Sequence, residues 1–226
     1  MHGGGYYSCD IDIDFSVNLN PYPKSAKEDA VIQAALEEGL GNASKYPDIF
    51  QTDVRTAVSD AEGVDAGCVY AANGASELIM AVTLMTAPQK ALLVAPGYTG
   101  YEYALTARNG CRIIRYFLNE EKDFRPGRDI LEMITDDTDI LYLQDPVNPT
   151  GRNIDGTLLS DILDKANRCY VTVLYDRSFY MLSDGFGRKG LSGNELINRY
   201  DNLYLVSSYT KSFALPGIRM GYVMPA

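Results

Sequence analysis

Five segments of this 226-residue sequence place residue types capable of chemistry directly after short apolar runs. The first, Asn73-Gly74-Ala75-Ser76, follows CVYAA and precedes an apolar stretch. Small residues at a helix start let backbone N–H groups and the positive end of the helix dipole face an anion. A plain capped helix, with Ser76 as the N-cap or as an extra donor, explains the same residues. Both interpretations stay open from this segment alone.

The second and third segments supply a ring and an amide. Tyr98 follows ALLVA, and a tyrosine there either stacks on a flat ligand or packs in the core. Asn148 lies in DPVNPTG, which follows DILYLQ. Proline and glycine are typical of an ordinary turn. An asparagine fixed between two prolines also suits an amide that must hydrogen-bond a ligand.

In the fourth segment, Asp176 directly follows the apolar run YVTVLY. A charge at the end of a buried strand costs free energy unless it is paired, so this carboxylate needs a cationic partner. Arg177, the next residue, is one candidate. The other is the protonated ring nitrogen of a cofactor.

The fifth segment, SSYTKSFALPGIR, gathers two cations and several hydroxyls around one loop. Lys211 and Arg219 stand among apolar residues of an acidic protein, close to the hydroxyls of Ser208 and Thr210. A surface loop explains each cation alone but not the pair.

Together these segments are the set that pyridoxal 5′-phosphate (PLP) requires. A lysine amine forms a Schiff base with its aldehyde. A carboxylate keeps the pyridine nitrogen protonated, so that the ring accepts an electron pair. An amide binds the phenolic oxygen, while hydroxyls, backbone N–H groups and an arginine hold the phosphate. Each charge-assisted hydrogen bond contributes about 1.5–3 kcal/mol.

Alternating strands and helices are needed to bring these segments together. Short apolar runs predict strands at 68–72, 91–95, 112–117, 139–144, 170–175, 202–207 and 219–224, and helical periodicity predicts helices at 28–38, 52–61, 76–85 and 156–168. Continuous apolar strands separated by helices indicate an α/β fold with a mostly parallel seven-stranded sheet sandwiched by helices. Ligands of such sheets gather beyond the carboxyl ends of the strands, where the five segments lie.

The first residues are polar and rich in turn-forming types. The prolines of NLNPYP favour an extended backbone, so we predict an N-terminal extended arm over residues 1–25 and one large domain over residues 26–226.

Charge and histidine content exclude several classes of function. His2 is the single histidine, which excludes a Ser-His-Asp relay, a multi-histidine zinc site and a c-type haem. The 20 basic and 30 acidic residues give a net charge of −10 without a basic run, which argues against nucleic acid or anionic membranes as partners. No apolar stretch approaches the roughly 18 residues of a membrane span, and no secretory signal is present.

The cysteines argue against a metal site. Cys9, Cys68, Cys111 and Cys169 stand singly, without a CxxC pair. Since each borders an apolar segment, we expect buried, reduced thiols in a cytoplasmic protein.

From about residue 10 to its end, the chain resembles the class I/II aminotransferases, which are fold-type I PLP enzymes. SSYTKSFALPGIRMGY carries the resemblance, with NPTG and LYD before it. The resemblance implies that Lys211 is the Schiff-base lysine, Asp176 the pyridinium partner, Asn148 the ligand of the phenolic oxygen and Tyr98 the stacking ring. It assigns the phosphate to Gly74, Ala75, Ser76, Ser208, Thr210 and Arg219. Tyr46, in KYPD, resembles the tyrosine that reaches the neighbouring subunit's phosphate, which implies a homodimer with shared active sites.

Within that family the chain is most similar to the branch shared by histidinol-phosphate aminotransferase and threonine-phosphate decarboxylase. The opening HGG and DFSVNLNP resemble the decarboxylase. The resemblance assigns His2, Gly3, Asn18 and Asn148 to a small, phosphorylated amino-acid substrate, although a disordered terminus is the alternative for His2. It favours decarboxylation, with transamination as the alternative.

The sequence departs from the family pattern at two points. Phe179, followed by Tyr180, stands where many members have a tyrosine that binds the phenolic oxygen, and the decarboxylase resembles this phenylalanine version. The chain stops at Ala226, whereas relatives continue into a small domain of about 100 residues with the arginine that grips the substrate carboxylate. We therefore expect the C-terminal small domain to be missing. A fragment that binds PLP without turnover is the third hypothesis.

Overall fold

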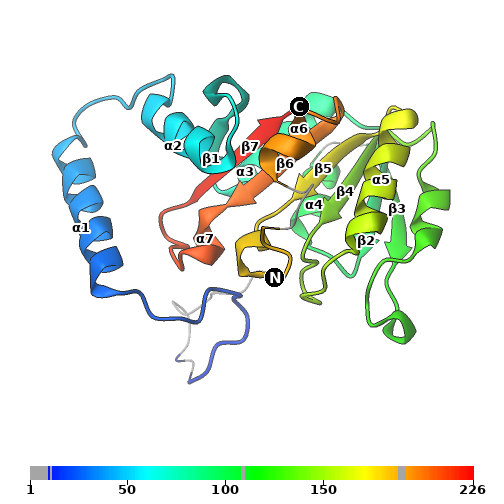
Figure 1. Ribbon diagram of the computed structural model, residues 1–226, viewed down its shortest axis with the longest axis horizontal. Helices are drawn as coiled ribbons and strands as arrows, with labels where there is room; N and C mark the ends of the chain where they lie inside the picture. The colour runs from blue at the N-terminus through cyan, green and yellow to red at the C-terminus, as the bar shows by residue number, and fades with distance from the viewer. Residues whose placement is uncertain (1–9, 11, 108–109, 188–191) are drawn as a thin grey trace.

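A seven-stranded sheet organises the computed structural model, which describes residues 10, 12–107, 110–187 and 192–226 (Figure 1). The strands are β1 (Tyr70–Asn73), β2 (Lys90–Ala95), β3 (Arg112–Phe117), β4 (Ile140–Gln144), β5 (Thr172–Asp176), β6 (Leu203–Ser208) and β7 (Met220–Pro225). Their order across the sheet is β1-β7-β6-β5-β4-β2-β3. The pairs from β3 through β6 are parallel, and β7 is antiparallel to both of its neighbours. The predicted α/β fold with a mostly parallel sheet is confirmed.

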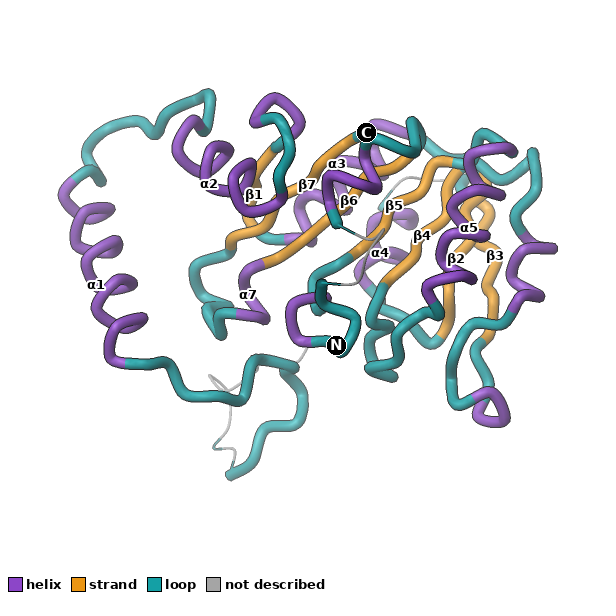
Figure 2. The backbone as a smooth tube through the Cα atoms, in the orientation of Figure 1, coloured by secondary structure: helices purple, strands orange, loops and turns teal. Residues whose placement is uncertain are grey.

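Alternation along the strands divides the core into two layers. Leu92 belongs to the core layer that also includes buried residues of the helices α2 (Thr52–Glu62), α5 (Gly156–Arg168) and α6 (Gly193–Ile197). Leu93 faces the opposite layer, which holds α3 (Ala75–Thr86) and α4 (Gly100–Thr106). Successive strand side chains point to opposite faces, so both faces of the sheet are buried. Figure 2 shows the same arrangement as strands between two sets of helices.

Helix α5 shows how the sequence pattern becomes packing. The carboxylate of Asp155 caps its start by accepting from the backbone N–H groups of Thr157 and Leu158. The apolar stripe predicted for this segment is buried in full: Leu158, Leu159, Ile162, Leu163 and Ala166. Placing these side chains against the sheet is the main stabilisation of the helix.

Several short helices are not predicted by the periodicity of the sequence. Besides α4 and α6, they include α7 (Tyr209–Ser212) and 3₁₀ turns at Ala66–Cys68, Glu120–Lys122, Arg128–Met133 and Tyr180–Leu182. A helix of four to seven residues presents too few turns for an apolar stripe to recur.

Helix α1 (Ala26–Gly41) differs from the others in having no buried residue. Ser25 and Glu28 form a capping box at its start, which explains the helix locally. In Figure 1 it stands apart from the sheet at the left of the molecule. The division into an arm of residues 1–25 and a large domain of 26–226 stays a prediction.

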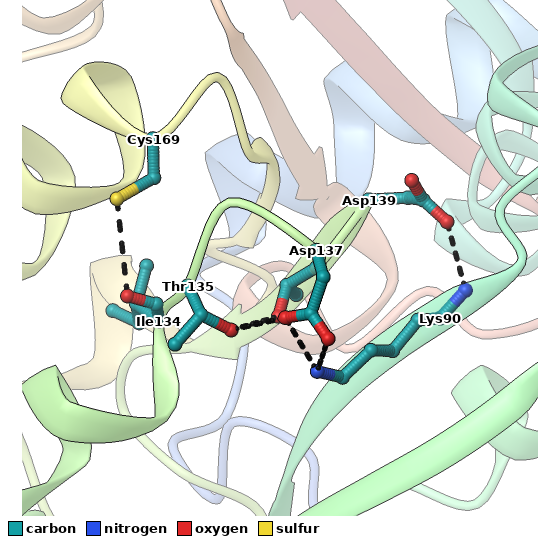
Figure 3. Close-up of polar contacts among 7 residues, drawn as sticks. Lys90, Ile134, Thr135, Asp137, Asp139 and Cys169 are labelled. Carbon is teal, nitrogen blue, oxygen red and sulfur yellow. Dashed lines mark hydrogen bonds and ion pairs between the residues drawn. The ribbon is translucent and has the colours of Figure 1, made fainter.

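The amino ends of β2 and β4 are joined by charged groups (Figure 3). Lys90 Nζ lies 2.7 Å from the Asp137 carboxylate, and the Asp139 carboxylate accepts from the backbone N–H groups of Gln89 and Lys90 at 2.7 and 2.8 Å. Nearby, the thiol of Cys169 donates to the carbonyl of Ile134 at 3.9 Å. These contacts fix the strand ends that lie farthest from the five segments described above.

The expected burial of the cysteines is wrong for the three that the structure describes. Cys68, Cys111 and Cys169 form no disulfide within the described residues, as expected of reduced thiols, but they are only half-buried. Each lies at the end or edge of an element rather than inside a strand or helix. Cys9 lies outside the described residues.

Within the described ranges, no helix is long and apolar enough to cross a membrane. The same residues contain no group of three or more histidine, cysteine, aspartate or glutamate side chains placed to hold a metal ion.

Candidate active site

The five chemistry-bearing segments meet at the carboxyl edge of the sheet. Asn73, Gln144, Asp176 and Ser208 end β1, β4, β5 and β6, which all run in one direction. Because β7 runs the opposite way, the residue that precedes it, Arg219, lies at the same edge. The sheet topology thus gathers segments separated by up to about 150 positions of sequence.

Glycines allow a close approach between the β1–α3 loop and β7. Gly74 has a φ of +83°, and a Cβ there would lie 2.8 Å from Nη2 of Arg219. A Cβ on Gly221 would lie 2.7 Å from the carbonyl carbon of Gly74. Arg219 also donates from Nη1 to the Pro216 carbonyl at 3.1 Å. The absence of side chains on Gly74 and Gly221 therefore lets the guanidinium and β7 lie directly against the backbone at the start of α3.

Ser76 does not cap helix α3, so this part of the sequence interpretation is wrong. Gly74 occupies the N-cap position, and the cap has no side-chain hydrogen bond. Ser76 lies one residue inside the helix, where its hydroxyl oxygen is 3.1 Å from that of Tyr98. The start of α3 lacks a side-chain cap, which leaves the anion interpretation in place.

Buried hydroxyls shape the turn that carries Lys211. The Ser208 hydroxyl lies 2.8 Å from that of Thr210 and donates to the Met220 carbonyl at 3.3 Å. It also accepts from the Thr210 backbone N–H, which caps α7. The turn is thereby fixed between β6 and the start of β7.

Asp176 is 2% exposed and has hydrogen-bond donors but no cation. Its carboxylate accepts from the Tyr101 hydroxyl at 2.7 Å and from the Ser178 backbone N–H at 2.8 Å. Burial raises the pKa of Asp176, and the bonds from Ser178 and Tyr101 partly offset that shift. No ion pair in the described part of the chain includes this carboxylate.

Arg177 is not the partner of Asp176, contrary to one of the two candidates from sequence. Its Nη1 lies 3.5 Å from Oε2 of Glu62, and its guanidinium carbon lies 4.2 Å from the centre of the Tyr180 ring. Successive residues of an extended strand point to opposite faces, so the neighbouring charge faces away from Asp176.

Lys211 is half-buried, and its ammonium lies 5.9 Å from the centre of the Phe179 ring. Burial lowers the pKa of Lys211, and the positive charge of Arg219 lowers it further. The arm holds the backbone of this turn, since the Asn20 N–H donates to the Lys211 carbonyl at 3.0 Å and its Nδ2 to the Ser212 carbonyl at 2.9 Å. A lysine with a depressed pKa supplies more of the neutral, nucleophilic amine.

Asn148 is held from two sides. Its backbone N–H donates to Oε1 of Gln144 at 3.0 Å, and its Oδ1 accepts from Nδ2 of Asn18 at 3.4 Å. Asn18, Asn148 and Phe179 line one pocket of about 310 Å³. The arm therefore reaches the edge of the sheet at the predicted asparagine.

One predicted residue lies away from this edge, and two others are not described. Tyr46 lies on the loop between α1 and α2 and is 99% exposed. His2 and Gly3 lie outside the described residues. The structure thus tests neither the subunit-bridging tyrosine nor the N-terminal substrate contacts.

Sequence reasoning missed the residues that support the site. Tyr101, Ser178, Gln144 and Asn20 each bond a predicted site residue or its backbone. Tyr101 and Ser178 lie two or three positions beyond residues already singled out, so proximity to strand ends was an available signal. For Asn20 no such signal exists in the sequence, because only the tertiary fold brings it to the turn of Lys211.

Comparisons with known proteins point to one family. The model of aminotransferase class I and II matches residues 10–224. Threonine-phosphate decarboxylase of Salmonella typhimurium is 33% identical over 222 residues, which cover 96% of this chain and 57% of the relative. Histidinol-phosphate aminotransferase of Methanothermobacter thermautotrophicus is 26% identical over 93% of this chain and 53% of the relative.

A solved structure agrees. The histidinol-phosphate aminotransferase of Clostridium acetobutylicum matches with a TM-score of 0.79 at 25% identity, covering 93% of this chain and 59% of that one. The chain spans somewhat more than half the length of the relatives it matches.

Proposed function

Because the chain belongs to the class I and II aminotransferase family, we propose that its carboxyl edge binds PLP for an enzyme acting on a small, phosphorylated amino acid. The observation that carries the proposal is Asp176, a buried carboxylate without a basic partner in the described residues, on the edge that also carries Lys211. A protonated ring nitrogen supplies the missing partner.

The residues present fit the cofactor in three respects. The buried carboxylate has lone pairs left over after its two hydrogen bonds. Because Gly74 has no Cβ, the Arg219 guanidinium lies against the backbone at the start of α3, and a cation beside free backbone N–H groups suits a phosphate. Lys211 has a lowered pKa, as an amine that must bond an aldehyde requires.

In this proposal each candidate residue has one role. Lys211 would bond the cofactor, Asp176 would pair with its ring nitrogen, Tyr98 would stack on the ring and Asn148 would donate to the phenolic oxygen. Its phosphate would be held by Gly74, Ala75, Ser76, Ser208, Thr210 and Arg219. When bound, PLP supplies an aldehyde for the substrate amine and a protonated ring that accepts an electron pair.

The chain's own groups handle protons at the substrate. Lys211 Nζ takes the α-proton in transamination or returns one after carbon dioxide has left in decarboxylation. Asn18, which touches Asn148, contacts the substrate together with His2 and Gly3 in this proposal.

Decarboxylation is the reaction we favour, supported by the 33% identical decarboxylase and by Phe179. Histidinol-phosphate-type transamination is the second candidate, supported by the 26% identical relative. Incubating the protein with PLP and threonine phosphate, with and without a keto-acid acceptor, separates them. Carbon dioxide supports the first, acceptor-dependent keto acid the second, and PLP binding without either product identifies a module that is catalytically incomplete.

The proposal includes a homodimer in which Tyr46 reaches the partner's phosphate. Its exposure is what such a reach requires. Tyr46→Ala protomers mixed with Lys211→Ala protomers should regain tight PLP binding, because a mixed dimer contains one intact site. Mixing without any recovery would contradict the shared site.

The proposal also places the protein in the cytoplasm, with residues 26–226 as the cofactor-binding large domain and 1–25 as its arm. The three described cysteines, which are in no disulfide, support the location, since reduced cysteines persist there.

A further inference from the structure

We propose that Tyr101 is a positioning residue for Asp176: its hydroxyl holds one carboxylate oxygen so that the carboxylate meets the cofactor's ring nitrogen, ionised and in a fixed plane. This inference rests on the proposed PLP function. The hydrogen bond joins Tyr101 on α4 to the end of β5, with 2.7 Å between the hydroxyl and Oδ2 of Asp176.

Packing fixes the ring that carries this hydroxyl. The Tyr101 ring centre lies 5.4 Å from that of Tyr98, edge to face, and 5.3 Å from that of Tyr142. The Tyr142 hydroxyl lies 2.6 Å from Oγ1 of Thr83, which donates to the Ile79 carbonyl at 2.6 Å. The chain of contacts leads from helix α3 to the ring beside Asp176.

The hydroxyl acts as a permanent donor. Burial, together with the charge of Asp176, raises the pKa of Tyr101 well above its ordinary value, so the phenol keeps its proton. Within the described residues, Asp176 is compensated by Tyr101 and Ser178 and by no cation. A carboxylate oxygen deprived of a donor in such a site favours the protonated acid.

The consequence for the cofactor is specific to one atom. A protonated Asp176 no longer stabilises a protonated pyridine nitrogen. The hydrogen bonds to the cofactor's phosphate and the bond to Lys211 do not depend on the protonation of that nitrogen. Loss of the Tyr101 hydroxyl should therefore weaken the binding of PLP but not of an analogue with carbon in place of the ring nitrogen.

The test compares Tyr101→Phe with Tyr103→Phe, an exposed tyrosine two residues along the same helix. Absorbance titrations give the dissociation constants of PLP and of the 1-deaza analogue. We expect Tyr101→Phe to weaken PLP binding by about tenfold or more, as a hydrogen bond to a charged group implies, and to leave analogue binding unchanged. Tyr103→Phe should bind both like the wild type.

A second measurement separates the role of the hydroxyl from an effect on folding. Tyr101→Phe keeps the ring that packs on Tyr98 and Tyr142. In the double variant with Asp176→Asn, the Tyr101→Phe change should alter PLP affinity little, since both changes act through one carboxylate. Equal losses for PLP and analogue, or no loss of PLP binding, would overturn the role of Tyr101 alone. A wild type that binds neither compound would overturn the proposed function as well.

Discussion

The carboxyl edge of the sheet and the N-terminal arm with α1 contribute to the same candidate site in different ways. At the edge, Asp176 and Ser208 are buried and bonded to neighbouring strands and helices. In the other region α1 buries no residue, and the arm reaches the edge through a few hydrogen bonds from Asn18, Asn20 and Lys24. One region is fixed by the core, the other by contacts at its surface.

The difference shows which features a parallel sheet determines. Strand direction alone brings distant segments to one edge, whatever the intervening loops do. Helix α1 is explained by its capping box, which defines a helix but not its position. The cofactor contacts should therefore tolerate changes in α1, whereas the substrate contacts from the arm should not.

The largest expected difference between the regions is in stability. Ile162→Ala in buried α5 should lower the free energy of unfolding by about 2–5 kcal/mol, because it leaves a cavity in the core. Leu36→Ala in exposed α1 should change it by less than about 0.5 kcal/mol. Denaturant unfolding of both variants measures the contrast, and equal losses would mean that α1 is packed after all.

The next effect concerns the charge of Asp176. Asp176→Asn should weaken PLP binding by about 10- to 100-fold, the value of a charge-assisted bond. Without PLP the same variant should be more stable than the wild type at neutral pH. The reason is that burial raises the pKa of Asp176, so holding it ionised costs free energy above that raised pKa.

The pH dependence of this difference in stability follows from the raised pKa of Asp176. The advantage of Asp176→Asn should shrink as the pH falls through the raised pKa and vanish below the ordinary aspartate value of about 3.9. Unfolding free energies of both proteins across that range provide the measurement. A wild type more stable than the variant at neutral pH would show that the carboxylate is already compensated.

A smaller effect is expected where the two regions meet. Asn20→Ala removes the Nδ2 bond to the Ser212 carbonyl and, within the arm, the bond that Oδ1 accepts from the Tyr22 N–H, but it keeps the backbone bond to Lys211. We expect PLP affinity to fall by about threefold to tenfold, the effect of losing the one side-chain hydrogen bond of Asn20 that reaches the lysine turn. Gln33→Ala, on exposed α1, is the control. If both variants bind PLP like the wild type, the arm does not support the lysine turn.

The smallest effect is confined to α1. Ser25→Ala breaks the capping box and should loosen the helix by about 1 kcal/mol. Hydrogen exchange should rise in residues 26–41 while β4 and β5 keep their protection. Faster exchange in those strands would indicate that α1 and the sheet unfold as one unit.

Much of the sheet and its edge could be predicted from the residue pattern. Buried parallel strands are continuous apolar runs, so β2, β4 and β6 could be predicted from the apolar runs in the sequence. The carboxyl ends then place Asp176 and Lys211 together without further information. Short α4 was missed because seven residues offer too little periodicity, and with it the contact from Tyr101.

Other features depend on tertiary contacts that no local pattern records. Serine favours the N-cap position, which makes Ser76 a candidate, but Gly74 occupies that position with a φ of +83° and in close contact with Arg219. Arg177 was a candidate partner by adjacency, yet strand alternation turns it toward Glu62. In both cases proximity in sequence gave the wrong geometry.

The most direct test of the account is to locate the bond between cofactor and protein. The protein is incubated with PLP and reduced with borohydride, and its peptides are analysed by mass spectrometry, with Lys211→Arg as the control. The account predicts one pyridoxyl group on the peptide containing Lys211 in the wild type and none in the variant. Labelling of other lysines alone, or equal labelling in the variant, would contradict it.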